Sequence, residues 1–281
     1  MTTASPPREL SKADLIASPA ISHSALNKFA ESPLLYYRER IEKSIPRKEP
    51  SDAQIRGSQI EAFLRTGSVA DLTADWVRLP EEFANRRMTE KYRAWLQDSG
   101  TDNAKVLTRG DYDRLAGSQA EFEAELRLIR EGVVAHPFAK TYIDKGEWHC
   151  RLQWTDAEYG CECKGELDIV WNRQVIVDVK TANAKAFRDF PRECALRGYH
   201  SQAAYYQDAF EAWTGEVLPV AFVVIRNEQP YDCQTHEPTV RAMDRGRERY
   251  RALLGDLLER LRSGYWHGPT DTNIFDLPRW A

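Results

Sequence analysis

Apolar residues in the first half of the chain recur at helical spacing. Ser22 precedes Leu26 and Phe29, so it is placed to cap a helix that buries these two side chains. The same spacing of apolar positions predicts further helices over residues 32–37, 54–64 and 107–131, with Gly67 ending the second of these. The first half is therefore predicted to be mainly helical.

The spacing changes to two in the second half of the chain. Apolar residues occupy every second position from Trp148 to Trp154, which predicts a half-buried strand. Further strands are expected over residues 161–171, 175–180 and 217–225, and helices over residues 199–213 and 238–262. This order of elements predicts a fold of the α/β class, α+β in type, with a mixed central β-sheet flanked by helices.

Composition limits the class of protein. Of the 281 residues, 42% are hydrophobic and 29% charged, and the formal net charge is −4. These values are typical of a globular protein and exclude one that coats nucleic acid by bulk charge, although a local basic groove stays open. Residues 1–19 are rich in Ser, Thr and Pro and are predicted to be a flexible N-terminus, with a single domain with helical additions over residues 20–281.

Location and redox state follow from the absence of two patterns. No stretch is long and apolar enough to span a membrane, and residues 1–14 contain no apolar leader segment. The chain has five cysteines, an odd number. We therefore expect a cytoplasmic protein with reduced thiols.

Acidic residues interrupt two of the predicted strands. Glu166 and Asp168 lie on one strand, and Asp178 and Lys180 lie on the next after a three-residue turn. Antiparallel pairing then sets Asp168 opposite Asp178 and Glu166 opposite Lys180, with Cβ atoms about 4.5–5.5 Å apart. Two carboxylates this close repel unless a cation lies between them, and oxygen ligands suit Mg²⁺ or Mn²⁺. The alternative is an ordinary acidic outer face of a sheet.

These motifs carry a family resemblance. The pattern Gly-x-x-Asp, a strand, and Asp-x-Lys resembles the PD-(D/E)XK nuclease superfamily, and Gln202-x-x-Tyr205 is similar to a motif of its RecB-like members. Within them, the chain looks most like the RecE-like (exonuclease VIII) group of phages and prophages. The segments with this likeness are Ile21-Ser22-x-Ser24-x-Leu26, His136-Pro137, Cys161-x-Cys163-Lys164, Tyr199-His200 and Leu277-Pro278-x-Trp280.

The resemblance assigns roles to particular residues. It implies that Asp168, Asp178 and the backbone carbonyl of Val179 bind the metal, that Lys180 is catalytic, and that two further residues support the site or contact DNA, namely Gln202 and Tyr205.

One further acid completes the implied metal site. Glu61 stands where many RecE-like sequences have His, and as a hard oxygen ligand it is expected to complete the metal site. Its alternative interpretation is a solvated helix residue. His149 stands where this family is expected to have Glu, and Glu147 is the alternative match. Both are left outside the metal shell.

The resemblance also implies an activity. It indicates a Mg²⁺-dependent exodeoxyribonuclease, in which Mn²⁺ can substitute, that degrades linear double-stranded DNA from 5′ to 3′. The product would be a 3′ single strand for an annealing recombinase, and the enzyme would be a homo-oligomer, a ring-like tetramer. The alternatives are a repair or defence nuclease with endonuclease activity or the opposite polarity, and a nuclease fold that only binds DNA.

Some further features of the sequence have two interpretations, and others exclude a class of site. Two groups of basic residues would line a phosphate groove or form solvated faces: Arg241, Arg245, Arg247, Arg249 and Arg251, and Arg86, Arg87, Lys91 and Arg93. Tyr199, Tyr205 and Tyr206 would stack on bases or belong to the core. The cysteine spacing fits neither a four-thiolate iron–sulfur cluster nor a zinc site. No phosphate loop or Gly-x-Ser-x-Gly motif is present.

Overall fold

The computed structural model describes residues 8–46, 50–67, 83, 89–99 and 119–266. Over these residues seven strands form one mixed sheet in the order β1-β3-β4-β5-β6-β7, and β2 pairs with β4 beside this path. The strands are β1 Arg8–Glu9, β2 Ile21–Ser22, β3 Glu147–Thr155, β4 Glu162–Trp171, β5 Val175–Ala182, β6 Val220–Arg226 and β7 Cys233–His236. The predicted mixed central sheet is confirmed.

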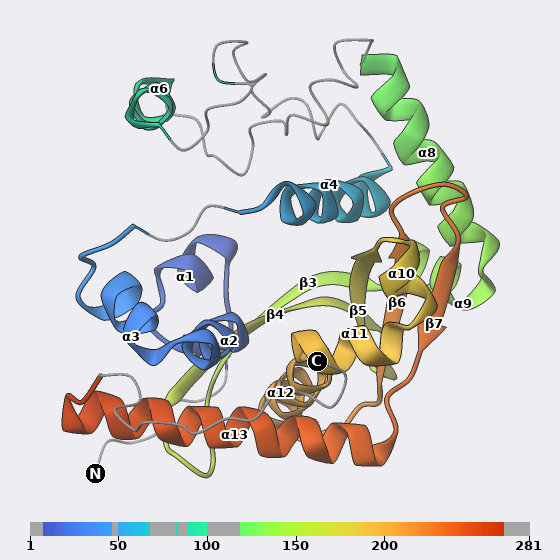
Figure 1. Cartoon of the computed structure of the whole chain (residues 1–281). Helices are drawn as coiled ribbons and strands as arrows, with labels where there is room; N and C mark the ends of the chain where they lie inside the picture. Colours follow the sequence, from blue (N-terminus) through green and yellow to red (C-terminus); the bar gives the residue numbers. More distant parts are fainter. Residues whose placement is uncertain (1–7, 47–49, 68–82, 84–88, 100–118, 267–281) are drawn as a thin grey trace, which may run out of the picture.

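Helices cover both faces of this sheet (Figure 1). One layer packs α4, α8 and α9 against Ile169, Val177 and Val223. The opposite layer packs α2, α12 and α13 against Leu167 and Phe222. The helices are α1 Lys12–Ala17, α2 His23–Glu31, α3 Pro33–Tyr36, the π-helix η1 Tyr37–Ile41, α4 Asp52–Thr66, α6 Glu90–Ser99, α8 Gln119–Ala135, α9 Pro137–Lys145, α10 Ala184–Arg188, α11 Phe190–Arg197, α12 Tyr199–Thr214 and α13 Val240–Ser263.

The predicted elements fall close to the observed ones. Ser22 caps α2 by accepting a hydrogen bond from the N–H of Ala25, as expected. The helix predicted over residues 107–131 is α8, which begins at Gln119, and residues 107–118 lie outside the described ranges. The N-terminal segment contributes β1, which pairs with β3, and α1. The remaining division of the chain into a flexible terminus and one domain stays a prediction.

The turn between β4 and β5 fixes the register that the sequence predicted. Residues 172–174 form the turn, with Asn172 and Arg173 at positive φ, and the N–H of Gln174 donates to the carbonyl of Trp171 at 2.9 Å. Asn is common in this left-handed conformation. The antiparallel pairs run from Trp171–Val175 to Ile169–Val177 and end there. The expected ladder pairs Asp168–Asp178 and Glu166–Lys180 are therefore not formed.

Because the ladder ends early, β4 divides its edge between two partners. Residues 169–171 of β4 pair with β5, whereas Cys163 and Lys164 pair with Ile21 and Ser22 of β2. Residues 165–168 of β4 have no strand partner on this edge within the described residues. We call this gap between β4 and β5 the fork.

Side-chain alternation reverses beside the fork. Trp148 packs with the cluster under α4, whereas Cys150, two residues further along β3, belongs to the cluster under α12. The strand pattern of the sequence predicted one face for both, and this is wrong. The change of face falls at His149, whose φ is 62°, and the paired strand β4 changes face at the same place, between Leu167 and Ile169.

No helix in the described ranges has the length and apolarity that a membrane crossing requires.

Candidate active site

Asp178 and Lys180 lie together on β5 at the fork. Parallel pairing places them opposite Phe222 and Val224 of β6, so both face α12. Asp178 is 1% exposed, and its carboxylate forms an ion pair with the Lys180 ammonium, whose side chain is 15% exposed. Burial lowers the pKa of Lys180, but the charges of Asp178 and Asp168 outweigh this and hold it above its usual value.

Asp168 reaches across the fork from β4. Its Oδ2 accepts a hydrogen bond from the backbone N–H of Val179 at 2.8 Å, so a side chain takes the place of a ladder bond. Burial, and then the nearby Asp178 carboxylate, raise the pKa of Asp168 well above its usual value. The two aspartates therefore lie close to one another, as the sequence predicted, although they are not a ladder pair.

The donors of this pair suit a hard divalent cation. Asp178 Oδ1 is buried and has no hydrogen-bond partner among the described residues. A buried carboxylate oxygen without a partner is unfavourable, and a second carboxylate beside it adds repulsion. Mg²⁺ or Mn²⁺ would relieve both. As the side chains lie, however, no three His, Cys, Asp or Glu residues within the described ranges form a ready-made metal cluster.

Glu61 approaches the same site from α4, on the other helical layer. Ser51 and Gln54 form a capping box that starts α4, and Gly57 lets the helix approach β5 because a Cβ there would lie 3.1 Å from Thr181 Oγ1. Glu61 follows one turn later. Burial raises its pKa; His149 opposes this, and the charges of Glu166 and, more weakly, Asp178 add to it. Its side chain is thus near the aspartates but is not assembled with them as a ligand set.

His149 and Glu166 occupy the space beside Glu61. His149 Nε2 lies 3.7 Å from Glu61 Oε1, and its Nδ1 lies 3.3 Å from Glu166 Oε1. Glu166 also forms an ion pair with Arg151, its neighbour across the β3–β4 ladder. Burial raises the pKa of Glu166, but its contacts with His149 and Arg151 outweigh this and lower it. Glu147 lies exposed at the start of β3.

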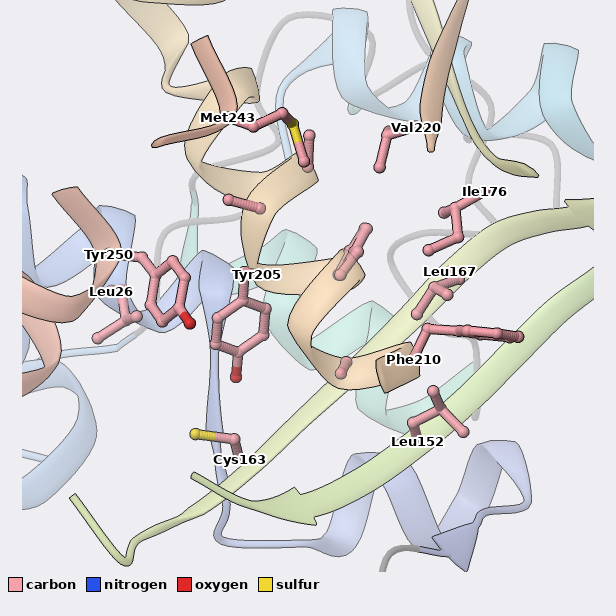
Figure 2. Packing of buried hydrophobic residues seen from close by; sticks show 14 of the residues in the cluster. Leu26, Leu152, Cys163, Leu167, Ile176, Tyr205, Phe210, Val220, Met243 and Tyr250 are labelled. Carbon is pink, nitrogen blue, oxygen red and sulfur yellow. The ribbon is translucent and has the colours of Figure 1, made fainter. Parts of the chain in front are cut away.

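The Gln-x-x-Tyr motif lies on α12, and its two named residues have different surroundings. Gln202 Nε2 donates to the hydroxyl of Tyr206 at 3.0 Å. Tyr206 is near the carboxylates: burial raises its pKa, and Asp168 and Asp178 raise it further. Tyr205 instead donates to the backbone carbonyl of Ile21 at 2.6 Å, at the junction of β2 and β4, and it lies in the core in Figure 2.

The sequence motif thus predicted Gln202 at the site. Of the two adjacent tyrosines it named Tyr205, whereas Tyr206 is the one that lies near the carboxylates. The helical i to i+4 relation between Gln202 and Tyr206 is the signal that would have found Tyr206. Tyr199 also lies at the site, because the Lys180 ammonium sits 4.8 Å from the centre of its ring. Tyr205 and Tyr206 are buried, which favours the core interpretation over base stacking for these two residues.

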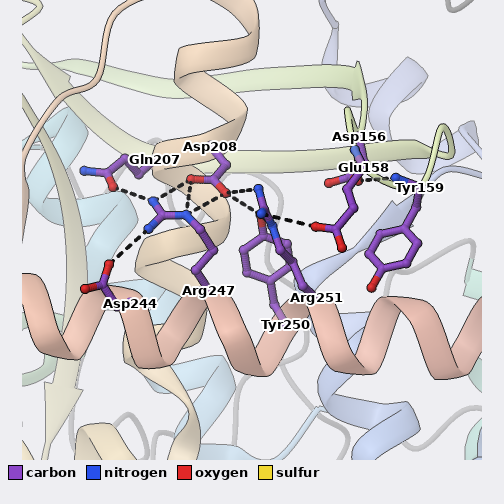
Figure 3. A network of polar contacts seen from close by, with 9 residues as sticks. All are labelled: Asp156, Glu158, Tyr159, Gln207, Asp208, Asp244, Arg247, Tyr250 and Arg251. Atoms are coloured by element: carbon purple, nitrogen blue, oxygen red, sulfur yellow. Dashed lines mark hydrogen bonds and ion pairs between the residues drawn. The ribbon is translucent and has the colours of Figure 1, made fainter.

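Three of the five arginines in the basic group of α13, Arg245, Arg247 and Arg251, form ion pairs with acids. Figure 3 shows Arg247 and Arg251 directed at Asp208 of α12, with shortest distances of 2.7 and 3.5 Å. Arg251 also lies 3.2 Å from Glu158. Arg245 pairs with an acid on its own helix. For these arginines, the ion pairs favour a solvated face, in which acids balance the basic charge, over a phosphate groove. In the other basic group, Arg86 and Arg87 lie outside the described residues.

The fold and the fork together define a PD-(D/E)XK-like protein. A family model described as a PDDEXK-like domain of unknown function (DUF3799) matches residues 22–268. The chain belongs to this family.

The chain also resembles solved structures, of which two are described. A "Putative exonuclease" from Eubacterium rectale superposes with a TM-score of 0.60 and 16% identity, over 92% of this chain and 88% of that one. An alkaline exonuclease from Laribacter hongkongensis gives a TM-score of 0.31 and 12% identity, over 69% and 94% of the two chains. The first supports the fold, and the second is too distant to carry an argument. No curated protein sequence matches the chain.

Proposed function

We propose that the chain is a metal-dependent nuclease whose centre is the fork between β4 and β5. The observation that carries this proposal is the meeting of Asp168, Asp178 and Lys180 at one point, with a buried Asp178 oxygen left without a partner. Family membership supports it, because a PDDEXK-like domain is named for this set of residue types.

The residues have separate roles in this proposal. Asp168 and Asp178 would hold Mg²⁺, for which Mn²⁺ can substitute, and Glu61 and the Val179 carbonyl would complete the ligand set. A bound divalent ion supplies Lewis-acid stabilisation of charge on the phosphodiester. The Lys180 ammonium provides N–H donors beside Asp178 and orients the attacking water and the phosphate.

Support for Lys180 and the two aspartates comes from α12. Tyr199 places its ring beneath the Lys180 ammonium, and Gln202 holds the Tyr206 phenol near the two aspartates. Both tyrosines lie on α12, so one helix orders this face of the site.

We further propose that the substrate is linear double-stranded DNA, digested as an exonuclease from 5′ to 3′. The resemblance to RecE-like enzymes supports this polarity, a 3′ single-stranded product passed to an annealing recombinase, a ring-like homo-oligomer such as a tetramer, and action in the cytoplasm. The rival proposals are an endonuclease or an exonuclease of opposite polarity, and a fold that only binds DNA.

Substrate topology separates these proposals. The purified protein should shorten 5′-labelled linear duplex in Mg²⁺ with early release of labelled mononucleotide, and EDTA should stop the reaction. Covalently closed circles should stay intact, because an exonuclease requires an end. Cleavage of circles would favour the endonuclease, and late release of the 5′ label would favour the opposite polarity. Binding without any Mg²⁺- or Mn²⁺-dependent degradation would favour the binding-only fold.

A further inference from the structure

His149 has a backbone conformation that its place in a strand does not explain. Its φ is 62°, and among the non-glycine residues with positive φ in the described ranges, His149 alone lies within a strand. Such a conformation costs about 1–3 kcal/mol in a residue with a Cβ and persists where the surroundings determine it. Glycine would adopt it without strain. The imidazole is therefore the feature to explain.

The imidazole of His149 lies between two acids. One ring nitrogen lies 3.7 Å from Glu61 on α4 and the other 3.3 Å from Glu166 on β4. Glu166 is held in turn by Arg151. The ring is only 20% exposed, and polar contacts run from Arg151 and Glu166 of the sheet, through His149, to Glu61.

Resting on the proposed function, we propose that His149 is a positioning residue that holds Glu61 at the fork, so that this carboxylate can join Asp168 and Asp178 around a divalent cation. Glu61 lies on α4, whereas the two aspartates lie on the strands β4 and β5, and its carboxylate is carried on a flexible side chain. Residues that orient a metal ligand typically change metal affinity 10–100-fold when they are removed.

A glycine substitution separates this role from a purely structural one. His149→Gly removes the imidazole and also removes the backbone strain, so the melting temperature in metal-free buffer should be retained or rise. Mn²⁺ affinity, measured by titration calorimetry, should fall by about 10-fold or more. Lys43→Gly is the matched control, since Lys43 is an exposed residue with a similar φ of 58° and should keep the wild-type Mn²⁺ affinity.

A double-mutant cycle tests whether His149 acts through Glu61. Glu61→Gln should weaken Mn²⁺ binding, and adding His149→Gly to it should weaken binding little further. Wild-type affinity in His149→Gly, or additive losses in the double variant, would overturn the proposal. If His149→Gly does not fold, Glu166→Gln provides the same test from the far side of the ring and should weaken Mn²⁺ binding.

Asp178→Asn distinguishes this proposal from the proposed function itself. Full Mn²⁺ binding by Asp178→Asn would contradict the metal site at the fork. Loss of binding in Asp178→Asn together with wild-type affinity in His149→Gly would leave the nuclease proposal standing and remove only the role of His149.

Discussion

A titratable residue, His23, is buried near the charged groups of the fork. His23, at the start of α2, is 4% exposed, and its Nε2 lies 3.1 Å from Ser201 Oγ on α12. Burial lowers its pKa to about 3, and the charges of Lys180, Arg249 and His200 act in the same direction. The folded protein therefore keeps this imidazole neutral at pH values where an unfolded chain protonates it.

The stability of the protein should therefore depend on pH through His23. Above its ordinary pKa of 6.5 both states are neutral, whereas between 6.5 and about 3 only the unfolded chain binds the proton. The free energy of unfolding then falls by about 1.4 kcal/mol for each pH unit below 6.5. Urea unfolding at pH 7.5 and 5.5 should show a smaller acid loss in His23→Asn than in the wild type. An equal loss in both proteins would contradict the assignment.

At this scale the sequence predicted part of the site. Asp168, Asp178 and Lys180 were found because a period of two and a short turn place them near one another. Tyr206 and the contact of His149 with Glu61 were not found. The first depends on how α12 is rotated against the sheet, and the second on the positive φ of His149, which lies where β3 and β4 both change face.

At the scale of elements, the close packing of α13 on α12 places the tyrosines at the fork. Gly246 of α13 allows this approach, because a Cβ there would lie 2.2 Å from the backbone carbonyl oxygen of His200. Main chain cannot move aside as a side chain can, so the helices would have to separate. The helix that carries Gln202 and Tyr206 would then shift as well.

Two glycines of α13 should respond oppositely to alanine. In an exposed helix, Gly→Ala stabilises by about 1 kcal/mol. Gly246→Ala should instead lower the free energy of unfolding by about 1–3 kcal/mol, because it overpacks the α12–α13 contact. Gly255→Ala is the matched control, since its Cβ would meet only the hydroxyl end of the exposed Tyr159 side chain. Urea unfolding measures both, and equal effects would contradict this packing argument.

The sequence predicted the elements correctly where they are long and periodic, as in α12, α13 and β4. The strands β1, β2 and β7 were missed because stretches of two to four residues, such as Ile21–Ser22, carry no usable periodicity. Tertiary pairing with β3, β4 and β6 makes them strands. The fork could not be predicted for the same reason, since it exists because β2 takes the edge of β4 that β5 leaves.

At the scale of the whole molecule, the sheet divides the ligands of the proposed metal between its two sides. The α4 layer supplies Glu61, and the strands supply Asp168 and Asp178 where β4 and β5 separate. The net charge of −4 is compatible with a nucleic-acid substrate, because a divalent cation bound at the fork would offset the charge of Asp168 and Asp178.

The most direct test of the central claim compares Mg²⁺-dependent degradation of linear duplex DNA by the wild type, Asp178→Asn and Lys180→Ala. Each variant should lose about 100-fold or more in rate, because each removes a charged group at the reacting phosphate. The exposed controls Asp98→Asn and Lys145→Ala should match the wild type. Wild-type rates in Asp178→Asn or Lys180→Ala, with folding retained, would contradict the fork as the catalytic centre.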